Sequence, residues 1–234
     1  IKDYVFLCFL LGNDFLPHFP ALNIRTNGID CIMDVYKTCS IDPKFHLITK
    51  SNNIVWRNFR KLIMMLAAEE HNYLKDEYNF RRKAEKNVAK YYFNKNVPIT
   101  ERKKQIDEKL LHLPLKERQV EEYINPYERG WEHRYYKTLI GFDIDDERRK
   151  QIATNYIEGL EWTLKYYTAD CPDWSWKYNY NYPPLLTDLA KYIPYFDIEF
   201  ISKQKTLNTG PVEPIVQLSY VLPRASMDLL PKKT

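Results

Sequence analysis

One aspartate stands in the kind of loop that can present a metal ligand. Asp14 follows Gly12 and Asn13, directly after a run of eight apolar residues, Tyr4–Leu11. Such a run is too short to cross a bilayer and too apolar for a surface, so we expect it to be buried on nearly all sides. A carboxylate that leaves a buried element in a Gly-Asn turn closed by Pro17 is suited to bind a hard cation such as Mg²⁺.

The same loop also has a purely structural explanation. Glycine at the end of a helix, followed by Asn and Asp, is a common turn. Asn13 is kept as a residue that can line the site. His18, beside the loop, faces substrate in one interpretation and is hydrogen-bonded within the fold in the other. Asp3 is predicted to cap the first helix. It lies roughly 16 Å from Asp14 along an α-helix, too far for both carboxylates to bind one ion.

The longer string around the loop carries a family resemblance. Residues 3–18 read Asp-Tyr-Val-Phe-Leu-Cys-Phe-Leu-Leu-Gly-Asn-Asp-Phe-Leu-Pro-His. This string closely resembles a block found in the XRN family of 5′→3′ exoribonucleases. More distantly, its Gly-x-Asp-Phe centre is similar to a late metal-binding loop of flap-endonuclease-like nucleases. The resemblance implies that Asp14 is a catalytic metal ligand.

A second block, Gly130-Trp-Glu-His-Arg-Tyr-Tyr136, is also similar to an element of that family. Trp131, Arg134 and Tyr135 fall at helical spacing, so core packing explains much of the pattern. An arginine on such a face needs a carboxylate or a phosphate as partner. We expect a carboxylate, and we keep Arg134 as a residue that can line the site.

A third block is an aromatic segment with rings at alternate positions: Trp174, Trp176, Tyr178, Tyr180 and Tyr182. In an extended chain these rings share one side. We expect the tyrosines to pack on helices, and one tryptophan at the edge to stack on a nucleobase. The segment resembles an XRN segment that has a tryptophan stacked on the 5′ base, which implies Trp176 first and Trp174 second. The sequence departs from that segment at Lys177 and at 181–183.

The elements that must position these residues read as helices. Apolar spacing predicts helices over Gly28–Lys37, from Asn53 (capped by Asn52 or Asn53) past Tyr78, and over Glu147–Tyr167. The last forty residues are predicted to wrap across the helices as ordered coil with short helical turns, and regular sheet has little support. The fold class is therefore mainly α, an irregular multi-helix domain with long ordered coil segments. The resemblance implies that it completes a flap-endonuclease-like α/β nuclease core.

Charge divides the chain into three parts: 1–80 with the metal loop, a basic variable arm or linker over 81–122, and 123–234 with the aromatic segment and the proline-rich tail. The first and third are expected to form one structural unit. Arg81–Arg118 holds twelve Lys and Arg against five Asp and Glu, a net +7, whereas the whole chain carries +4. Such an arm either follows RNA phosphates or is a solvated helical or disordered insertion.

Composition excludes several classes of protein. The sequence shows no signal peptide and no membrane span. Its four cysteines form no C-x-x-C pair, so we expect free thiols in a reducing compartment and no zinc site. The protein is accordingly expected to be intracellular, with the cytoplasm favoured over the nucleus. The chain starts at Ile1 without Met, which suggests a fragment of a longer protein.

The resemblance implies an activity that this chain can provide only in part. It implies metal-assisted hydrolysis of single-stranded RNA bearing a 5′-monophosphate, with release of mononucleotides and with two Mg²⁺ (or Mn²⁺) ions. The remaining acidic ligands and the 5′-phosphate pocket would belong to an N-terminal nuclease segment, so the chain alone is expected to be inactive. The alternative is a non-catalytic RNA-binding or scaffolding helical module.

Overall fold

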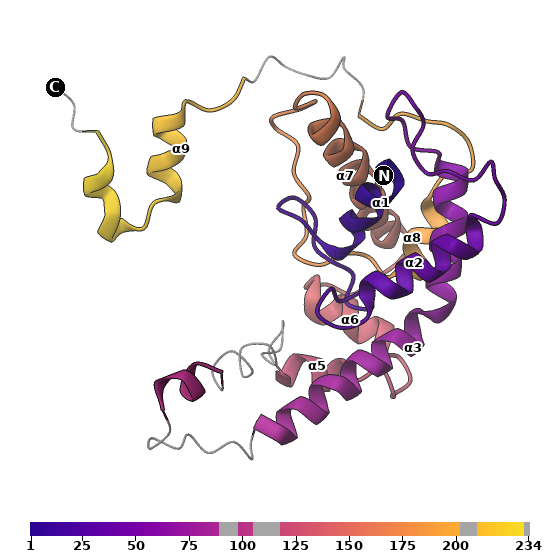
Figure 1. Cartoon of the computed structure of the whole chain (residues 1–234), viewed down its shortest axis with the longest axis horizontal. Helices are drawn as coiled ribbons and strands as arrows, with labels where there is room; N and C mark the ends of the chain where they lie inside the picture. Colours follow the sequence, from indigo (N-terminus) through magenta and orange to yellow (C-terminus); the bar gives the residue numbers. More distant parts are fainter. Residues whose placement is uncertain (89–97, 105–117, 202–209, 232–234) are drawn as a thin grey trace.

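The computed structural model describes residues 1–88, 98–104, 118–201 and 210–231 (Figure 1). The α-helices are α1 (Lys2–Cys8), α2 (Gly28–Cys39), α3 (Trp56–Val88), α5 (Arg118–Ile124), α6 (Trp131–Leu139), α7 (Asp146–Thr168), α8 (Leu186–Tyr192) and α9 (Pro214–Val221). Two 3₁₀ helices, η1 (Phe9–Leu11) and η3 (Arg224–Leu229), and a short helical segment over 99–104 also lie in the described ranges. No β-strand occurs in the described ranges; Ile48 and Ile54 form only an isolated bridge. The prediction of a mainly α fold is confirmed.

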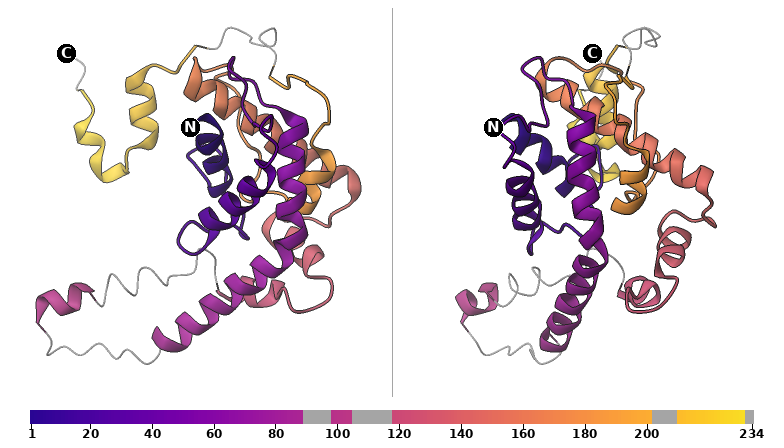
Figure 2. Two further views of the ribbon diagram at one scale, coloured as in Figure 1. Left: turned by 45° about the vertical axis from the view of Figure 1, so that its right-hand side comes forward. Right: turned by 90° about the vertical axis from the view of Figure 1, so that its right-hand side faces the viewer.

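One apolar core brings together residues from the two ends of the sequence. Its buried side chains come from α1, η1, α2 and α3 on one side and from α7 and α8 on the other. A smaller core lies under α6, where Trp131, Tyr135 and Tyr136 pack with Ile152 of α7. Figure 2 shows the C-terminal end of α3 extending away from this helical body, beside α5. Residues on both sides of the basic arm therefore share the same cores.

The long helices agree with the sequence pattern. The expected helices over 28–37 and 147–167 are α2 and α7, and the side chain of Asp145 caps α7 by accepting the amide of Arg148 at 2.8 Å. The prediction that Asn52 or Asn53 caps α3 is wrong. Asn52 has a φ of 63° and lies with Asn53 in the turn that precedes Trp56.

The first helix is less buried than its apolar run predicts. Phe6 and Leu7 are 1% exposed, but Tyr4 and Val5 on the opposite face are 49% and 45% exposed. The run is therefore one-sided, because a helix of this length packs on the core with only one face.

The prediction that Asp3 caps the first helix is also wrong. Its side chain makes no cap hydrogen bond. The carboxylate instead accepts the hydroxyl of Tyr36 at 2.8 Å and the amides of Leu47 and Ile48 at 2.9 Å. Asp3 is thus structural, but it joins α1 to α2 and to the segment before α3.

The proline-rich tail differs from its prediction in one respect. It contains the expected short helical turns, α9 and η3, but neither element buries a side chain. Both lie apart from the helical body (Figure 1). Residues 195–201, in contrast, cross α3 and α7 as ordered coil: Trp56 donates to the Ile198 carbonyl and Glu161 accepts the amide of Phe200. The predicted wrapping therefore holds for this first part of the tail and not for α9 and η3. Most of the basic arm, 89–97 and 105–117, lies outside the described residues. At its two ends, Arg81 and Glu121 form an ion pair of 2.5 Å between α3 and α5.

The cysteines are poor candidates for chemistry. Cys8, Cys31, Cys39 and Cys171 are free thiols, and burial raises the pKa of each of them. A thiol with a raised pKa stays protonated near neutral pH, and the protonated form is neither a good nucleophile nor a good metal ligand.

Among the helices that the structure describes, none combines the length and the apolar character needed to cross a membrane.

A short helix that the sequence pattern did not predict, α8, is anchored by a buried carboxylate of α3. Glu70 is 4% exposed. It accepts the amide of Leu186 at 2.6 Å, and the amide and hydroxyl of Thr187 at 3.1 and 2.8 Å. It thereby satisfies donors at the start of α8, which have no partner within the helix. Burial raises the pKa of Glu70 from its usual value of 4.5 to about 7, although these hydrogen bonds oppose the shift.

This raised pKa predicts a specific pH dependence of stability. The unfolded chain loses the Glu70 proton near pH 4.5 and the folded chain only near pH 7, so the free energy of unfolding falls as the pH rises between these values. We expect a decrease of at most about 3 kcal/mol from this group, since one pKa unit corresponds to about 1.4 kcal/mol. Urea unfolding of the wild type and of Glu70→Gln at pH 5 and pH 7.5 measures it. Equal pH dependence in both proteins would contradict the prediction.

Candidate functional site

The loop that carries Asp14 has a fixed backbone. Gly12 has a φ of 92°, and a Cβ at this position would lie 3.0 Å from the Cβ and backbone N of His18, so the turn requires glycine. The side-chain oxygen of Asn13 accepts the amides of Phe15 and Leu16, both at 2.9 Å, and the amide of Asn13 donates to the Leu16 carbonyl at 3.0 Å. These bonds hold the backbone around Asp14 without using its carboxylate.

Asp14 itself is exposed. Within the described ranges no hydrogen bond or ion pair joins its carboxylate to another residue, so the group is available to a cation. One carboxylate does not make a metal site, because Mg²⁺ takes six ligands in near-octahedral geometry. No group of three or more His, Cys, Asp or Glu side chains suited to a metal occurs among the described residues. Among the described residues, Asp14 could therefore supply at most part of such a site.

Aromatic rings seat this loop on the C-terminal half of α7. The ring of Phe15 meets Trp162 edge-on at 4.8 Å between centroids, and meets Tyr166 at 5.0 Å. Trp162 stacks on Tyr166 at 5.2 Å and 9°, and on Trp176 at 5.3 Å and 23°. Edge-to-face and offset-stacked pairs are the preferred geometries of aromatic side chains. We call these four residues, Phe15, Trp162, Tyr166 and Trp176, the aromatic array.

A glycine of α7 lets the loop and the aromatic segment approach each other. A Cβ on Gly159 would lie 2.6 Å from Cδ2 of Leu16 and 2.7 Å from Cη2 of Trp176. No side chain fits at that distance, so Leu16 and Trp176 meet over the bare helix backbone. The structure thus brings the Asp14 loop and the tryptophan segment, more than 150 residues apart in sequence, to the same part of α7.

The aromatic segment alternates as predicted from Trp176 onward. Residues 176, 178, 180 and 182 are half-buried, whereas 177, 179 and 181 are exposed. Tyr178 meets Tyr156 of α7 at 5.5 Å and donates its hydroxyl to the Tyr182 carbonyl. The packing of these tyrosine rings on helices follows the structural explanation. Trp174 lies outside the alternation, in a turn, and is 53% exposed.

Three buried side-chain polar atoms in the described part of the chain have no hydrogen-bond partner. They are Nδ2 of Asn13, Oγ1 of Thr163 and Nε1 of Trp176. All three belong to the loop, to α7 beside Trp162, or to the aromatic segment. Buried polar groups are nearly always paired in folded proteins, and exceptions concentrate where function sets the structure. Two of the three, on Asn13 and Trp176, belong to the segments that meet over Gly159.

Arg134 is held mainly by backbone carbonyls, in addition to the predicted carboxylate partner. Its guanidinium donates to five backbone carbonyls at 2.9–3.3 Å, those of Tyr123, Ile124, Asn125, Glu128 and Arg129. The nearest carboxylate contact, to Glu128, is 3.9 Å long. Arg134 therefore holds the C-terminal end of α5 and the following turn, whose carbonyls lack partners within the helix. Its donors are occupied by this structural role.

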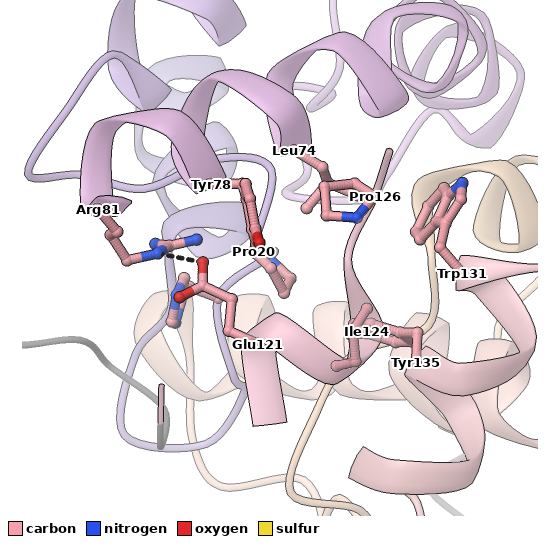
Figure 3. A pocket seen from close by; sticks show the side chains of 10 residues that line it. Pro20, Leu74, Tyr78, Arg81, Glu121, Ile124, Pro126, Trp131 and Tyr135 are labelled. Atoms are coloured by element: carbon pink, nitrogen blue, oxygen red, sulfur yellow. Dashed lines mark hydrogen bonds and ion pairs between the residues drawn. The ribbon is translucent and has the colours of Figure 1, made fainter. Parts of the chain in front are cut away.

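His18 lines a cavity between α3, α5 and α6, whose other lining residues are labelled in Figure 3. The cavity measures about 50 Å³ and is mainly apolar, with the Arg81–Glu121 ion pair at one end. Ligand pockets usually measure about 300–1,000 Å³, so this cavity is too small for a nucleotide. His18 lines it together with Pro20, Tyr78 and other residues of the three helices, which fits the structural interpretation of this histidine.

Two residues central to this arrangement were not singled out from the sequence. Phe15 carries the loop onto α7, and Gly159 makes room for it. The available signals were local: Phe15 directly follows Asp14, and Trp162 and Tyr166 are four residues apart, which places their rings on one face of a helix. Neither signal says that the two elements meet.

Comparison with known proteins agrees with the resemblance in the sequence. The family described as "Xrn1 helical domain" matches residues 1–110 and 83–234. The 5′-3′ exoribonuclease 2 homolog of Drosophila melanogaster is 27% identical over 268 aligned residues, which cover 99% of this chain and 28% of the relative. The human 5′-3′ exoribonuclease 1 is 27% identical, over 99% of this chain and 15% of the relative.

The Saccharomyces cerevisiae 5′-3′ exoribonuclease 1 is more similar over a shorter stretch. It is 42% identical over 111 residues, or 47% of this chain and 7% of the relative. The chain thus spans less than a third of the length of each of these three relatives. Because the family match extends from the first residue to the last, this chain belongs to the Xrn1 helical domain family.

Proposed function

We propose that this chain is the helical part of a 5′→3′ exoribonuclease that hydrolyses RNA bearing a 5′-monophosphate to mononucleotides. The observation that carries the proposal is the placement of Asp14. Its carboxylate is exposed and has no partner among the described residues. The aromatic array that seats its fixed loop includes Trp176 of the tryptophan segment. The names of the relatives support the direction of hydrolysis and the RNA substrate.

Asp14 would hold one of two Mg²⁺ (or Mn²⁺) ions. When bound, such ions polarise phosphoryl oxygens and lower the pKa of bound water. The further carboxylates that two ions need are not grouped with Asp14 in the described residues. We therefore place them, and the 5′-phosphate pocket, in another part of a longer polypeptide, as the partial coverage of the relatives suggests. In this proposal the helical segment completes a flap-endonuclease-like α/β nuclease core.

The chain's own residues then have separate tasks. Asn13 holds the loop by accepting two amides, which leaves the Asp14 carboxylate turned to solvent. Trp174 or Trp176 orients the 5′ end of the RNA by stacking on a base, a contact that tolerates any sequence. Fixed positions of this kind favour hydrolysis because they hold the reacting groups at the right distance before the reaction starts.

The first test compares this 234-residue chain with the full-length protein that contains it. The full-length protein should release mononucleotides from 5′-monophosphorylated RNA when Mg²⁺ is present, and should act far more slowly on RNA with a 5′-hydroxyl. The isolated chain should release none, because one carboxylate cannot hold two ions. Chromatography of the labelled products measures both rates. Mg²⁺-dependent release by the isolated chain would contradict the assignment of the other ligands to another segment.

One observation favours the alternative, a helical module that binds RNA without hydrolysing it: the described residues contain exposed aromatic rings, among them Tyr167 and Trp174, but no cluster of metal ligands. The same assay separates the two functions. A full-length protein that binds 5′-monophosphorylated RNA and releases no nucleotide in the presence of Mg²⁺ or Mn²⁺ would support the module and exclude the exoribonuclease.

A further inference from the structure

Trp162 contacts both segments to which the proposed function assigns a task. It lies on α7 and is 5% exposed. On one side it meets Phe15, the residue after Asp14. On the other it stacks on Trp176, and its indole Nε1 donates to the carbonyl of Asp173 at 2.9 Å.

The contact with Phe15 is transmitted to the metal ligand. Asn13 binds the amides of Phe15 and Leu16, so the loop moves as a unit and not one residue at a time. Phe15 meets both Trp162 and Tyr166 in edge-to-face geometry, and these two rings stack on each other nearly in parallel. A displacement of the indole ring would therefore move Phe15, and with it the carboxylate of Asp14.

The hydrogen bond from Trp162 to Asp173 likewise links the position of the indole to that of the tryptophan segment. The carboxylate of Asp173 accepts the amide of Ser175 at 2.8 Å and its hydroxyl at 2.6 Å, which closes a tight turn around Trp174. The carbonyl of the same residue accepts the indole N–H of Trp162. The indole thus fixes the turn that presents Trp174 as well as one face of Trp176.

We propose that Trp162 is a positioning residue that sets the separation between the Asp14 carboxylate and the ring that stacks on the 5′ base. The inference rests on the proposed function. Tryptophan meets the requirement because it offers two stacking faces, an edge and one N–H donor. Phenylalanine retains a ring but lacks the donor. An error of about 1 Å in the separation of reacting groups lowers rates by roughly 100-fold. Trp162 therefore affects the rate of hydrolysis although it touches neither ion nor RNA.

The test uses the full-length protein with Trp162→Phe, and with Trp131→Phe as matched control. Trp131 is 6% exposed and stacks on His71 in the smaller core. Both variants lose a buried indole, so both should lower the melting temperature by a similar amount. Only Trp162→Phe should lower kcat at least 10-fold and raise the Mg²⁺ concentration for half-maximal activity.

A second readout does not depend on turnover. RNA with 2-aminopurine as its first base, bound in EDTA, reports stacking through fluorescence quenching. Trp162→Phe should weaken the quenching at saturating protein, whereas Trp131→Phe should not. Phe15→Leu, which removes the other side of the contact, should reproduce the Mg²⁺ effect with normal quenching. This variant also serves if Trp162→Phe does not fold.

The outcomes distinguish this inference from the proposed function. If Asp14→Asn is inactive while Trp162→Phe and Phe15→Leu match the control in kcat, Mg²⁺ dependence and quenching, Trp162 is an ordinary core residue and the inference is wrong. If Asp14→Asn has normal turnover, the proposed function of the loop fails, and the inference fails with it. A loss of activity by Trp162→Phe that equals its loss of folded protein also contradicts a positioning role.

Discussion

Replacing Asp14 by Asn in the full-length protein should lower turnover by about 100-fold or more and leave the melting temperature unchanged or higher. Asparagine keeps the size of the side chain and suits the same turn, but it lacks the charge that a hard cation requires. Stability should not fall, because the Asp14 carboxylate has no hydrogen-bond or ion-pair partner among the described residues. It can rise if removing one charge from a group of carboxylates relieves their repulsion when no metal is bound.

The metal dependence of this variant makes the test specific. If Asp14 is a ligand, the lost activity should return in part at high Mg²⁺ or with Mn²⁺, because weaker binding is overcome by concentration. Asp76→Asn provides the matched control, since Asp76 is also an exposed aspartate, on α3. Turnover and melting temperature should be measured on the same preparations. Normal turnover in Asp14→Asn would show that Asp14 is a turn residue only.

Local sequence patterns were sufficient to predict the long helices and the turn that carries Asp14. The apolar spacing over 28–37 and 147–167 predicts α2 and α7 because each helix buries one face against a core. The string around Asp14 predicts an exposed carboxylate after a tight turn, and Gly12 explains the turn physically through its positive φ. The family assignment follows from the same strings and agrees with the match over the whole chain.

Tertiary partners could not be predicted in this way. Asp3 looks like a helix cap in sequence, yet it binds amides more than forty residues away, because these donors are closer to it in the fold than those of its own helix. Arg134 looks like one half of an ion pair, and it has such a partner in Glu128, but its hydrogen bonds go to backbone carbonyls. The short helix α8 depends on Glu70, over a hundred residues earlier. In each case the hydrogen-bond partners depend on which groups come together in the folded chain, and the spacing of residues in the sequence does not show this.

The two tryptophans of the aromatic segment show the same limit, and the structure changes what is expected of them. The family resemblance ranks Trp176 before Trp174 as the residue that stacks on the 5′ base. In the structure one face of Trp176 is covered by Trp162 and its Nε1 is buried, whereas Trp174 is 53% exposed. A base needs an accessible ring face, so the exposures favour Trp174, and the assignment stays open to experiment.

Alanine substitutions in the full-length protein should therefore separate an effect on RNA binding from an effect on stability. Trp174→Ala should weaken binding of 5′-monophosphorylated RNA by roughly 10-fold, the value of one stacking contact, with unchanged stability. Trp176→Ala should lower the free energy of unfolding by about 2–4 kcal/mol, because it leaves a cavity between Trp162 and Gly159. Fluorescence anisotropy of labelled RNA in EDTA and urea unfolding measure the two quantities.

Trp176→Phe distinguishes packing from base stacking at the same position. Phenylalanine retains a ring that can lie on Trp162, so most of the stability lost in Trp176→Ala should return. If Trp176 only packs, RNA binding should be normal in the phenylalanine variant and should fall in the alanine variant only as far as the fold is lost. If Trp176→Ala instead remains folded and loses RNA binding while Trp174→Ala binds normally, Trp176 is the stacking residue, and its ring must have a second face open to RNA opposite Trp162.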